Sequence, residues 1–307
     1  MSKTSDPKTT DRGTIAFVGL GAMGLGMAQS CLRAGHRVLG LDLNEGAVAR
    51  LIEAGGEKLT PDTARDAAIF VSVVLNAAQT RAILYDDPGF ARHLPGGAVI
   101  VSCATISPED ARDNAAQADG LGLLYLDAPI SGGAARAAQG ELSIMASGSR
   151  QAFEAAAPAL SAMAQSVHDL GPEAGAGSAM KAVNQLLAGV HIAAMGEALA
   201  LGISQGLTPE RILQVISVSA GTSWMFENRA PRVVEGDYEA RSAVDIWPKD
   251  LGIVTEIAES AALSTPVAGA ALARFREASS KGLGALDDSA ITQLYASEAG
   301  LSLPGRA

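Results

Sequence analysis

The sequence predicts an α/β protein in which a doubly wound parallel sheet is followed by an all-α domain. Short apolar segments alternate with helical segments up to about residue 171, which is typical of a parallel sheet covered by helices. From Gly175 onward the apolar residues recur with helical periodicity instead. We therefore expect a polar, frayed tail over residues 1–13, a sheet domain over residues 14–172 and a helical domain over residues 173–307.

Each expected strand is a short apolar run bounded by turn residues, and these runs cover Ile15–Leu20, Arg37–Leu41, Ala67–Leu75, Ala98–Ala104, Leu123–Ile130, Gly140–Ser147 and Ser166–Gly171. Between them, helices are expected from Ala22, within "QTRAILY" and over Ser107–Ala118, where Ser107 is a suitable N-cap followed by proline. In the helical domain we expect helices over Ala179–Gln205, Pro209–Val218, Asp245–Ala262, Pro266–Ser280 and Ser289–Ala296.

Composition narrows the function classes. The formal net charge of −10 argues against a nucleic-acid partner or an anionic membrane surface. The two cysteines, Cys31 and Cys103, form no C-x-x-C pair, which suits a reducing compartment and predicts a cytoplasmic protein. The four histidines lack the spacing of metal ligands, so no metal site is expected.

The long apolar stretch "AVNQLLAGVHIAAMGEALALGI" is expected to be a buried helix. Asn184, Gln185, His191 and Glu197 interrupt it, so it does not have the composition of a membrane span. A helix that is apolar nearly all round packs inside a protein or between subunits. A small helical domain cannot cover such a helix alone, and we therefore expect a homodimer or homotetramer.

The first strand runs into a glycine motif that predicts a dinucleotide site. Gly19, Gly21 and Gly24 form G-x-G-x-x-G, in which the glycines make a tight turn, admit a pyrophosphate and let the helix pack on the strand. The helix that follows directs its free N–H groups at that anion. Asp42 ends the second strand 18 residues after Gly24, where a carboxylate binds the ribose 2′-OH and favours NAD over NADP.

This interpretation makes the N-terminal domain a Rossmann-type domain with NAD as its cofactor. Its expected contacts are Gly19, Leu20, Gly21, Ala22, Met23, Gly24, Asp42 and Leu43. The alternative is a glycine-rich turn without a ligand. The strand before the glycines, the helix after them and the acid at the end of the next strand all disfavour that alternative.

Lys181 is the candidate for acid–base chemistry. Oxidation of an alcohol needs a base for the hydroxyl proton, and reduction of the carbonyl needs the same group as an acid. Lys181 lies near the start of the apolar helix, where desolvation would lower the pKa of its ammonium group. Asn184 and Gln185 follow at i+3 and i+4, so they share its face of the helix. On these residues alone, a surface lysine at a helix start is an equally good interpretation.

Four motifs in order extend the inference over nearly the whole chain, from Thr14 to about Ala296. They are "VGLGAMGLGMA", "DAPISGGAARAAQGELSIMASG", "GAGSAMKAVNQ" and "KDLGI". Together they resemble the β-hydroxyacid dehydrogenases, the family of 3-hydroxyisobutyrate dehydrogenase and tartronate semialdehyde reductase. The resemblance implies NAD-dependent oxidation of a small hydroxy acid. Within the family, the likeness is greatest to members that act on L-threonate, and it is carried by "VNQLLAGVHIAAMGEALAL", "GTSWMFENR" and "GDYEARSAVDIWPKDLG". This resemblance implies L-threonate as the substrate, oxidised at C2 to 2-oxo-tetronate.

The resemblance also implies roles for individual residues. It makes Lys181 the catalytic acid and base, with Asn184 and Gln185 beside it at the substrate. Relatives often have two asparagines after the lysine, and here Gln185 replaces the second. The substrate carboxylate is expected at a serine–glycine loop made of Ser131, Gly132 and Gly133.

Further cofactor contacts are implied at the ends of later strands and in the helical domain. Leu75 and Asn76 end the third main strand, although relatives often have proline where this chain has Asn76. Thr105 follows the next strand and is expected against the cofactor. Lys249, in "KDLG", is expected at the nicotinamide end.

Two alternatives remain open. One is a carbonyl reductase of the same family, or a 3-hydroxyisobutyrate-type dehydrogenase, acting on tartronate or succinic semialdehyde and often using NADP. An arginine after Asp42 would favour NADP, but Leu43 is there instead. The other is a non-catalytic dinucleotide-binding protein, since a fold does not fix a function. The presence of both Lys181 and the serine–glycine loop favours an enzyme, and Lys181 also disfavours the imine reductases, which share this fold and usually lack the lysine.

Overall fold

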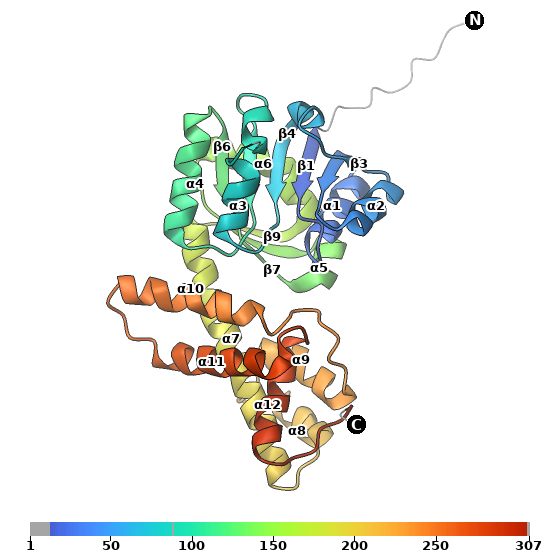
Figure 1. The fold of residues 1–307 in the computed structure, drawn as a ribbon, viewed down its shortest axis with the longest axis vertical. Helices are drawn as coiled ribbons and strands as arrows, with labels where there is room; N and C mark the ends of the chain where they lie inside the picture. The colour runs from blue at the N-terminus through green and yellow to red at the C-terminus, as the bar shows by residue number, and fades with distance from the viewer. Residues whose placement is uncertain (1–12, 88, 306–307) are drawn as a thin grey trace, which may run out of the picture. The chain divides into compact units, whose positions relative to one another are not determined.

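The computed structural model describes residues 13–87 and 89–305. The tail expected over residues 1–13 therefore lies outside the described residues, except for Gly13. The chain divides into two compact units, with the boundary between Ser178 and Ala179 (Figure 1). The first unit contains the sheets, and the second consists of helices.

The main sheet of the first unit is parallel throughout and has the strand order β3-β2-β1-β4-β5-β6. The prediction of a doubly wound parallel sheet is thus confirmed. The strands cover β1 Thr14–Val18, β2 Arg37–Leu41, β3 Glu57–Lys58, β4 Ala67–Ser72, β5 Val99–Ser102 and β6 Leu124–Asp127. Because the strands are parallel, the carboxyl ends of β1, β2, β4 and β5 meet at one edge.

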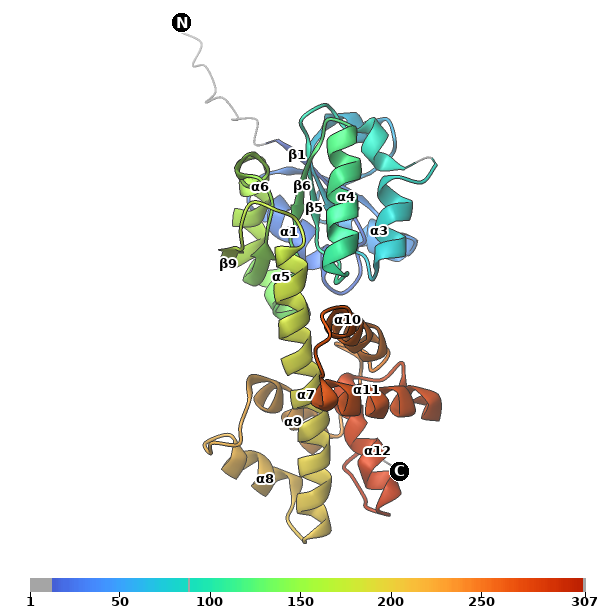
Figure 2. The same cartoon turned by 90° about the vertical axis from the view of Figure 1, so that its left-hand side faces the viewer.

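Helices cover both faces of this sheet, with α1 and α6 on one side and α3 and α4 on the other (Figure 2). Their bounds are α1 Gly24–Arg33, α2 Glu45–Glu53, α3 Ala77–Leu84, α4 Pro108–Gly120 and α6 Arg150–Met163. Successive strand residues point to opposite faces, so Ile15 and Phe17 pack in the core under α1 and α6. Ala16 and Val18 pack in the core on the other face.

A second, three-stranded sheet follows, in the order β7-β8-β9. Its strands are β7 Ile130–Ser131, β8 Leu142–Ala146 and β9 Ala164–Asp169, with α5 Gly133–Gln139 after β7. β7 pairs antiparallel with β8, whereas β8 and β9 are parallel. The single strand expected over Leu123–Ile130 is therefore divided. Pro129 lacks the N–H that a continuing ladder needs, and the chain leaves the main sheet there.

The second unit consists of helices that surround α7 (Ala176–Ser204). They are α8 Pro209–Ile216, α9 Trp224–Glu235, α10 Ile246–Ser260, α11 Pro266–Ala278 and α12 Ile291–Glu298, with a π-helical turn η3 over Ser279–Leu283 and a short 3₁₀ turn η4 over Asp288–Ala290. By length and composition alone α7 could cross a membrane. Its Ile192, Met195 and Leu199 instead pack in the core of the helical unit, as the sequence predicts for a buried helix.

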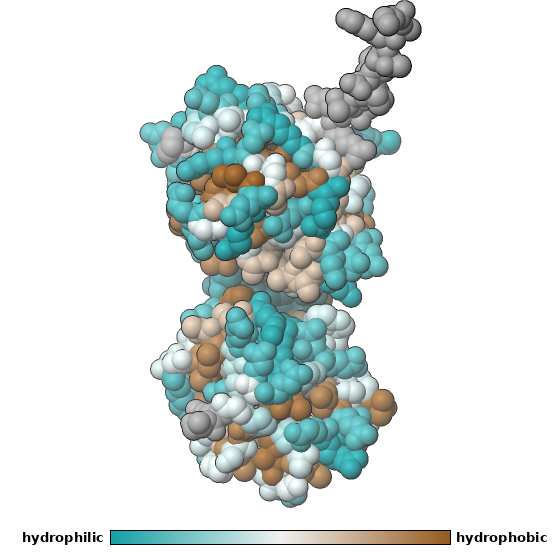
Figure 3. Space-filling view, turned by 90° about the vertical axis from the view of Figure 1, so that its right-hand side faces the viewer, coloured by the Kyte–Doolittle hydropathy of each residue, from teal (hydrophilic) through white to brown (hydrophobic). Residues whose placement is uncertain are grey.

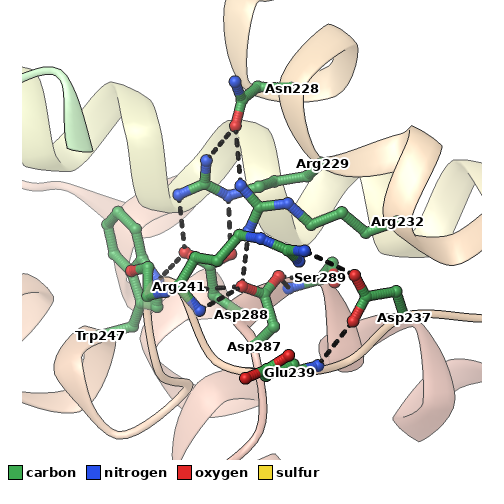
Figure 4. Close-up of polar contacts among 11 residues, drawn as sticks. Asn228, Arg229, Arg232, Asp237, Glu239, Arg241, Trp247, Asp287, Asp288 and Ser289 are labelled. Atoms are coloured by element: carbon green, nitrogen blue, oxygen red, sulfur yellow. Dashed lines mark hydrogen bonds and ion pairs between the residues drawn. The ribbon is translucent and has the colours of Figure 1, made fainter. Parts of the chain in front are cut away.

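A buried ionic cluster fixes α9 to the η4 turn (Figure 4). The guanidinium of Arg229 donates from Nε to Asp288 Oδ1 at 2.8 Å and from Nη2 to Oδ2 at 3.2 Å. Trp247 Nε1, from the first turn of α10, donates to the same carboxylate at 3.1 Å. Next to this pair, Arg232 donates to Asp287 Oδ2 at 2.5 Å. Both carboxylates are fully buried, so these bonds replace the hydration that they lost.

The cluster yields a stability prediction. Asp288→Ala leaves the Arg229 guanidinium buried without its carboxylate, and should lower the free energy of unfolding of the helical unit by about 3–5 kcal/mol. Denaturant unfolding followed by tryptophan fluorescence measures this, because Trp224 and Trp247 both lie in that unit. The control is Lys281→Ala, which removes a solvent-exposed ion pair and should leave the denaturant concentration at the unfolding midpoint unchanged. If the two variants have the same free energy of unfolding, the role given to Asp288 is contradicted.

Candidate functional site

The glycine motif forms the expected turn between β1 and α1. Gly19 has φ +93°, and a Cβ there would lie 2.0 Å from the carbonyl oxygen of Val73. A Cβ on Gly24 would lie 1.9 Å from the carbonyl oxygen of Gly19, so the start of α1 packs directly on the turn. At Gly21 a Cβ would meet nothing within 4 Å. The first and third glycines are thus required by the fold, whereas the second leaves open space in front of the loop.

Asp42 is tied to this loop by its own carboxylate. Its Oδ2 accepts a hydrogen bond from the backbone N–H of Leu20 at 2.6 Å, and its Oδ1 accepts one from the N–H of Asn44 at 2.7 Å. Two backbone donors therefore fix the carboxylate beside the glycine loop, and each oxygen keeps a lone pair for a ligand hydroxyl.

A cavity of about 500 Å³ opens at this point. It brings together four of the predicted cofactor contacts, namely Leu20, Gly21, Ala22 and Asp42. Arg50 of α2 and Ala134 of α5 also line it.

The other predicted contacts of the first unit lie at or near the same edge of the sheet. Met23 precedes α1, and Leu43 follows Asp42 with its side chain fully exposed. Leu75 is also exposed, and Asn76 is the N-cap of α3, where its side chain accepts from the N–H of Gln79 at 2.8 Å. Thr105 is half-buried beyond the end of β5.

The serine–glycine loop joins β7 to α5. Ser131 ends β7, and Gly132 and Gly133 both have positive φ values, 135° and 80°. Residues other than glycine rarely adopt such backbone angles, so the tight turn into α5 depends on these two glycines. A Cβ at Gly133 would meet nothing within 4 Å, so this loop too faces open space.

The pattern of the sequence does not single out Asp127, although it begins the motif "DAPISGG". Its buried carboxylate accepts hydrogen bonds from the N–H groups of Gly175 and Ser178, at 2.9 and 2.8 Å, and from the hydroxyl of Ser178 at 2.8 Å. The hydroxyl of Ser147 is at 3.4 Å. Burial raises the pKa of Asp127, and these donors oppose that rise. The acid therefore caps the first turn of α7, the helix that carries Lys181.

Lys181 is buried, with 7% of its surface exposed. Burial lowers the pKa of its ammonium group from 10.5 to about 8, because a desolvated cation is less stable than the neutral amine. The Asp250 carboxylate acts against this change by stabilising the cation, and the Lys249 ammonium acts with it. Lys181 is thus a buried lysine with a lowered pKa, and not the surface lysine that the sequence alone also allowed.

Asn184, Gln185 and Lys249 belong to a polar array beside this lysine. Asn184 Nδ2 donates to Gln185 Oε1 at 2.9 Å, and Gln185 Nε2 donates to Asp250 Oδ2. Lys249 Nζ forms an ion pair with Asp250 Oδ1 at 2.6 Å. Asp250 is itself only 3% exposed. It is a site residue that the sequence motif contains but does not reveal, because its partner Gln185 lies 65 residues away in the chain.

Two family models match the chain in succession. The NAD-binding domain of 6-phosphogluconate dehydrogenase matches residues 14–171, and the NAD-binding domain of NADP-dependent 3-hydroxyisobutyrate dehydrogenase matches residues 175–295. An L-threonate dehydrogenase of Escherichia coli O6:H1 is 47% identical over 303 residues, 97% of this chain and 99% of that protein.

The chain belongs to the 3-hydroxyisobutyrate dehydrogenase family.

More distant relatives and a solved structure agree with this membership. An NAD-dependent L-serine dehydrogenase of Pseudomonas aeruginosa is 35% identical and covers 92% of this chain and 97% of its own length. The crystal structure of a 3-hydroxyisobutyrate dehydrogenase from Salmonella typhimurium has a TM-score of 0.87 and 46% identity, with coverage of 92% of this chain and 99% of that one. Like other members of its family, this chain is an oxidoreductase that binds NAD(P).

The residues of the first unit fit that cofactor. The open space at Gly21 and the free N–H groups at the start of α1 suit a pyrophosphate, and the Asp42 carboxylate suits a ribose hydroxyl. When bound, NAD(P) would accept or supply a hydride. Among residues 13–87 and 89–305, no group of His, Cys, Asp or Glu side chains is arranged to hold a metal ion.

Two glycine variants separate the roles of the loop. Gly21→Ala should fold normally, because its methyl group enters open space, but should weaken NADH binding about tenfold or more by occupying the pyrophosphate position. Gly24→Ala should lower the melting temperature as well, because its methyl group meets the carbonyl of Gly19. NADH fluorescence titration and circular dichroism measure the two effects. Unchanged NADH affinity in Gly21→Ala would place the pyrophosphate elsewhere.

Proposed function

We propose that this protein is an NAD-dependent dehydrogenase of a four-carbon sugar acid, and that it oxidises L-threonate at C2 to 2-oxo-tetronate. The observation that carries the proposal is the buried Lys181, whose pKa of about 8 suits proton exchange with an alcohol near neutral pH. The choice of L-threonate is supported by relatives named L-threonate dehydrogenase, which are 43–47% identical over nearly the whole chain.

In the proposed reaction, the neutral amine of Lys181 accepts the proton of the C2 hydroxyl. NAD, when bound, would take the C2 hydrogen as a hydride, so that the carbon would become a carbonyl and the lysine an ammonium group. In the reverse direction the ammonium group returns the proton to the carbonyl oxygen. Asn184 holds the substrate beside the lysine, and the loop of Ser131, Gly132 and Gly133 binds the substrate carboxylate through its hydroxyl and N–H groups.

NAD rather than NADP is proposed because of Asp42. Its carboxylate is fixed by two backbone donors beside the glycine loop, where a negative charge would repel a 2′-phosphate. Leu43 follows it at the position where an arginine would attract the phosphate, so the preference for NAD rests on Asp42 against Arg50, a cation that lines the same cavity. Leu75, Asn76, Thr105 and Lys249 are proposed as further cofactor contacts.

A second candidate is a 3-hydroxyisobutyrate or semialdehyde substrate for the same catalytic group. It is favoured by the 46% identity to a solved structure that carries the name 3-hydroxyisobutyrate dehydrogenase. A branched or three-carbon substrate would use the same lysine and the same carboxylate loop, so substrate turnover decides between the candidates.

We also propose a soluble cytoplasmic homodimer or homotetramer. On α7 the side chains of Met180, Val183, Leu187 and Leu201 are exposed and lie on one face of the helix by their spacing. Figure 3 shows hydrophobic groups on the molecular surface, separated by hydrophilic residues. Buried, free Cys31 and Cys103 suit a reducing compartment. Light scattering that gives a monomer mass would contradict the oligomer.

A substrate and cofactor screen tests the proposal directly. With NAD, L-threonate should be turned over faster than 3-hydroxyisobutyrate or L-serine, and NADP should support the reaction at least about tenfold less well because of the charge of Asp42. NADH formation at 340 nm is the measurement, made at equal substrate concentrations. Preference for 3-hydroxyisobutyrate would select the second candidate, and no turnover of any of these acids would contradict both.

The acid–base role is tested by a matched pair of lysine variants. Lys181→Ala should lower kcat by about 10²–10⁴-fold, because no other group takes the hydroxyl proton, while NADH affinity stays close to that of the wild type. The control is Lys281→Ala, which removes a half-exposed surface lysine paired with Glu277 and should keep full activity. Wild-type turnover in Lys181→Ala would refute the assignment.

The pH dependence follows from the lowered pKa of Lys181. In the oxidation direction the neutral amine is the active form, so kcat/KM should rise with pH and level off above about 8. In the reduction direction the ammonium group is active, so kcat/KM should fall above the same pH. If kcat/KM instead changes near pH 10.5 in either direction, the lysine keeps its ordinary pKa.

A further inference from the structure

The resemblance places Gln185 at the substrate, but its amide is already occupied on both sides. Its oxygen accepts from Asn184 Nδ2 at 2.9 Å, and its Nε2 donates to Asp250 Oδ2. Gln185 is 7% exposed and Asp250 is 3% exposed, so this contact lies inside the protein. Gln185 is four positions after Lys181, which puts both side chains on the same face of α7.

We propose that Gln185 and Asp250 are a positioning pair for the proton transfer: Gln185 holds the Asp250 carboxylate at the face of α7 that carries Lys181, and the carboxylate stabilises the ammonium form of that lysine. The pair matters for catalysis only if Lys181 transfers the proton, and in this respect the inference rests on the proposed function. The hydrogen bond between Gln185 and Asp250, and the place of Gln185 about one turn after Lys181 on α7, do not depend on that function.

The charges around Lys181 give the pair its effect. The charged groups that act on its ammonium are Asp250 and Lys249, neighbours on α10, and they act in opposite directions. Burial alone would destabilise the ammonium further, and Asp250 is the group that opposes it. The proton affinity of Lys181 therefore depends on where the Asp250 carboxylate is held.

The two oxygens of the Asp250 carboxylate have different partners. Lys249 Nζ lies 2.6 Å from Oδ1, and this contact draws the negative charge toward α10 itself. The hydrogen bond from Gln185 fixes the other oxygen, Oδ2, to α7. A glutamine suits this place because it donates to the carboxylate with its amide nitrogen while its oxygen accepts from Asn184. A leucine there would leave Oδ2 without that donor, and a glutamate would bring a second negative charge against Asp250.

The two roles open to Gln185 predict different kinetics. A substrate contact would raise KM for the sugar acid when removed and would leave the titration of Lys181 where it is. A positioning residue would shift that titration and change kcat at fixed pH, with little effect on KM. The split between these readouts distinguishes the roles. Loss of a merely structural contact would hydrate Lys181 and move its midpoint upward, whereas loss of the positioning contact should move it downward.

The test is a titration of Lys181 in the intact, ligand-free protein. The chain contains six lysines, so ¹³C-lysine labelling gives a spectrum simple enough to assign by loss of one signal in Lys181→Met. The Lys181 signal of the wild type should titrate near 8. Asp250→Asn should move the midpoint down by about one pH unit or more, because the stabilising charge is gone. Gln185→Leu should move it in the same direction by less.

Loosening of the helix would hydrate Lys181 and raise its midpoint toward 10.5, so the downward shifts expected for Asp250→Asn and Gln185→Leu cannot come from misfolding. Two further variants complete the test. Lys249→Gln removes the opposing cation and should move the midpoint upward while tryptophan fluorescence stays that of the folded protein. Asp250→Glu keeps the charge and should titrate close to the wild type. Tryptophan fluorescence checks the fold, since Trp247 lies in the same helix as Asp250. Should Asp250→Asn fail to fold, Lys249→Gln and Gln185→Leu decide.

The proposal is overturned if the midpoint is the same in the wild type, Gln185→Leu and Asp250→Asn, or if Lys249→Gln shifts it downward. It is also overturned if Gln185→Leu raises KM about tenfold or more while the titration stays unchanged, because Gln185 is then a substrate contact. The titration needs neither substrate nor NAD. Absence of dehydrogenase turnover in the wild type would therefore contradict the proposed function. The titration midpoints would still decide whether Gln185 and Asp250 set the proton affinity of Lys181.

Discussion

The burial of one ammonium group is the constraint on which the rest of the site depends. Lys181 lies on the most apolar helix of the chain, and removing a cation from water favours its neutral form. Asp250 prevents that effect from going to completion, so the lysine keeps a pKa of about 8 instead of becoming a permanently neutral amine. In the proposed function, an apolar helix and a buried carboxylate thus allow one group both to accept and to return a proton. The buried thiol of Cys103 shows the contrasting case, since burial and the nearby Asp127 carboxylate together raise its pKa to about 12 and leave it uncharged.

The two units contribute different parts of the proposed chemistry. In the first, backbone groups and glycines dominate: Gly19 and Gly24 shape the loop, and Asp42 is held by two N–H groups. In the second, side chains dominate: Gln185 donates a hydrogen bond to Asp250, and the Asp250 charge stabilises the ammonium form of Lys181. The buried pair of Arg229 and Asp288 holds Trp247 at the start of α10, the helix that also carries Asp250. The helical unit therefore supports its catalytic face from within.

The sequence predicts the local features well because they depend on short-range chemistry. A glycine turn between a strand and a helix needs Gly19 and Gly24 whatever the rest of the chain does, and the serine N-cap at Ser107 is equally local. What the sequence does not predict depends on distant partners. Asp127 caps α7 across 51 residues, and Gln185 meets Asp250 across 65. The helices α6 and α9 are missed for another reason: each has a proline inside it, Pro158 and Pro231, which is a local signal against helix that tertiary packing overrides.

The most direct test of the central claim is a crystal structure of the protein with NADH and a non-reactive analogue of the sugar acid. If Lys181 is the proton donor and acceptor, its Nζ lies within hydrogen-bond distance of the oxygen at C2 of the analogue. A structure in which that nitrogen points into bulk solvent, and another titratable side chain contacts the C2 oxygen, would contradict the account.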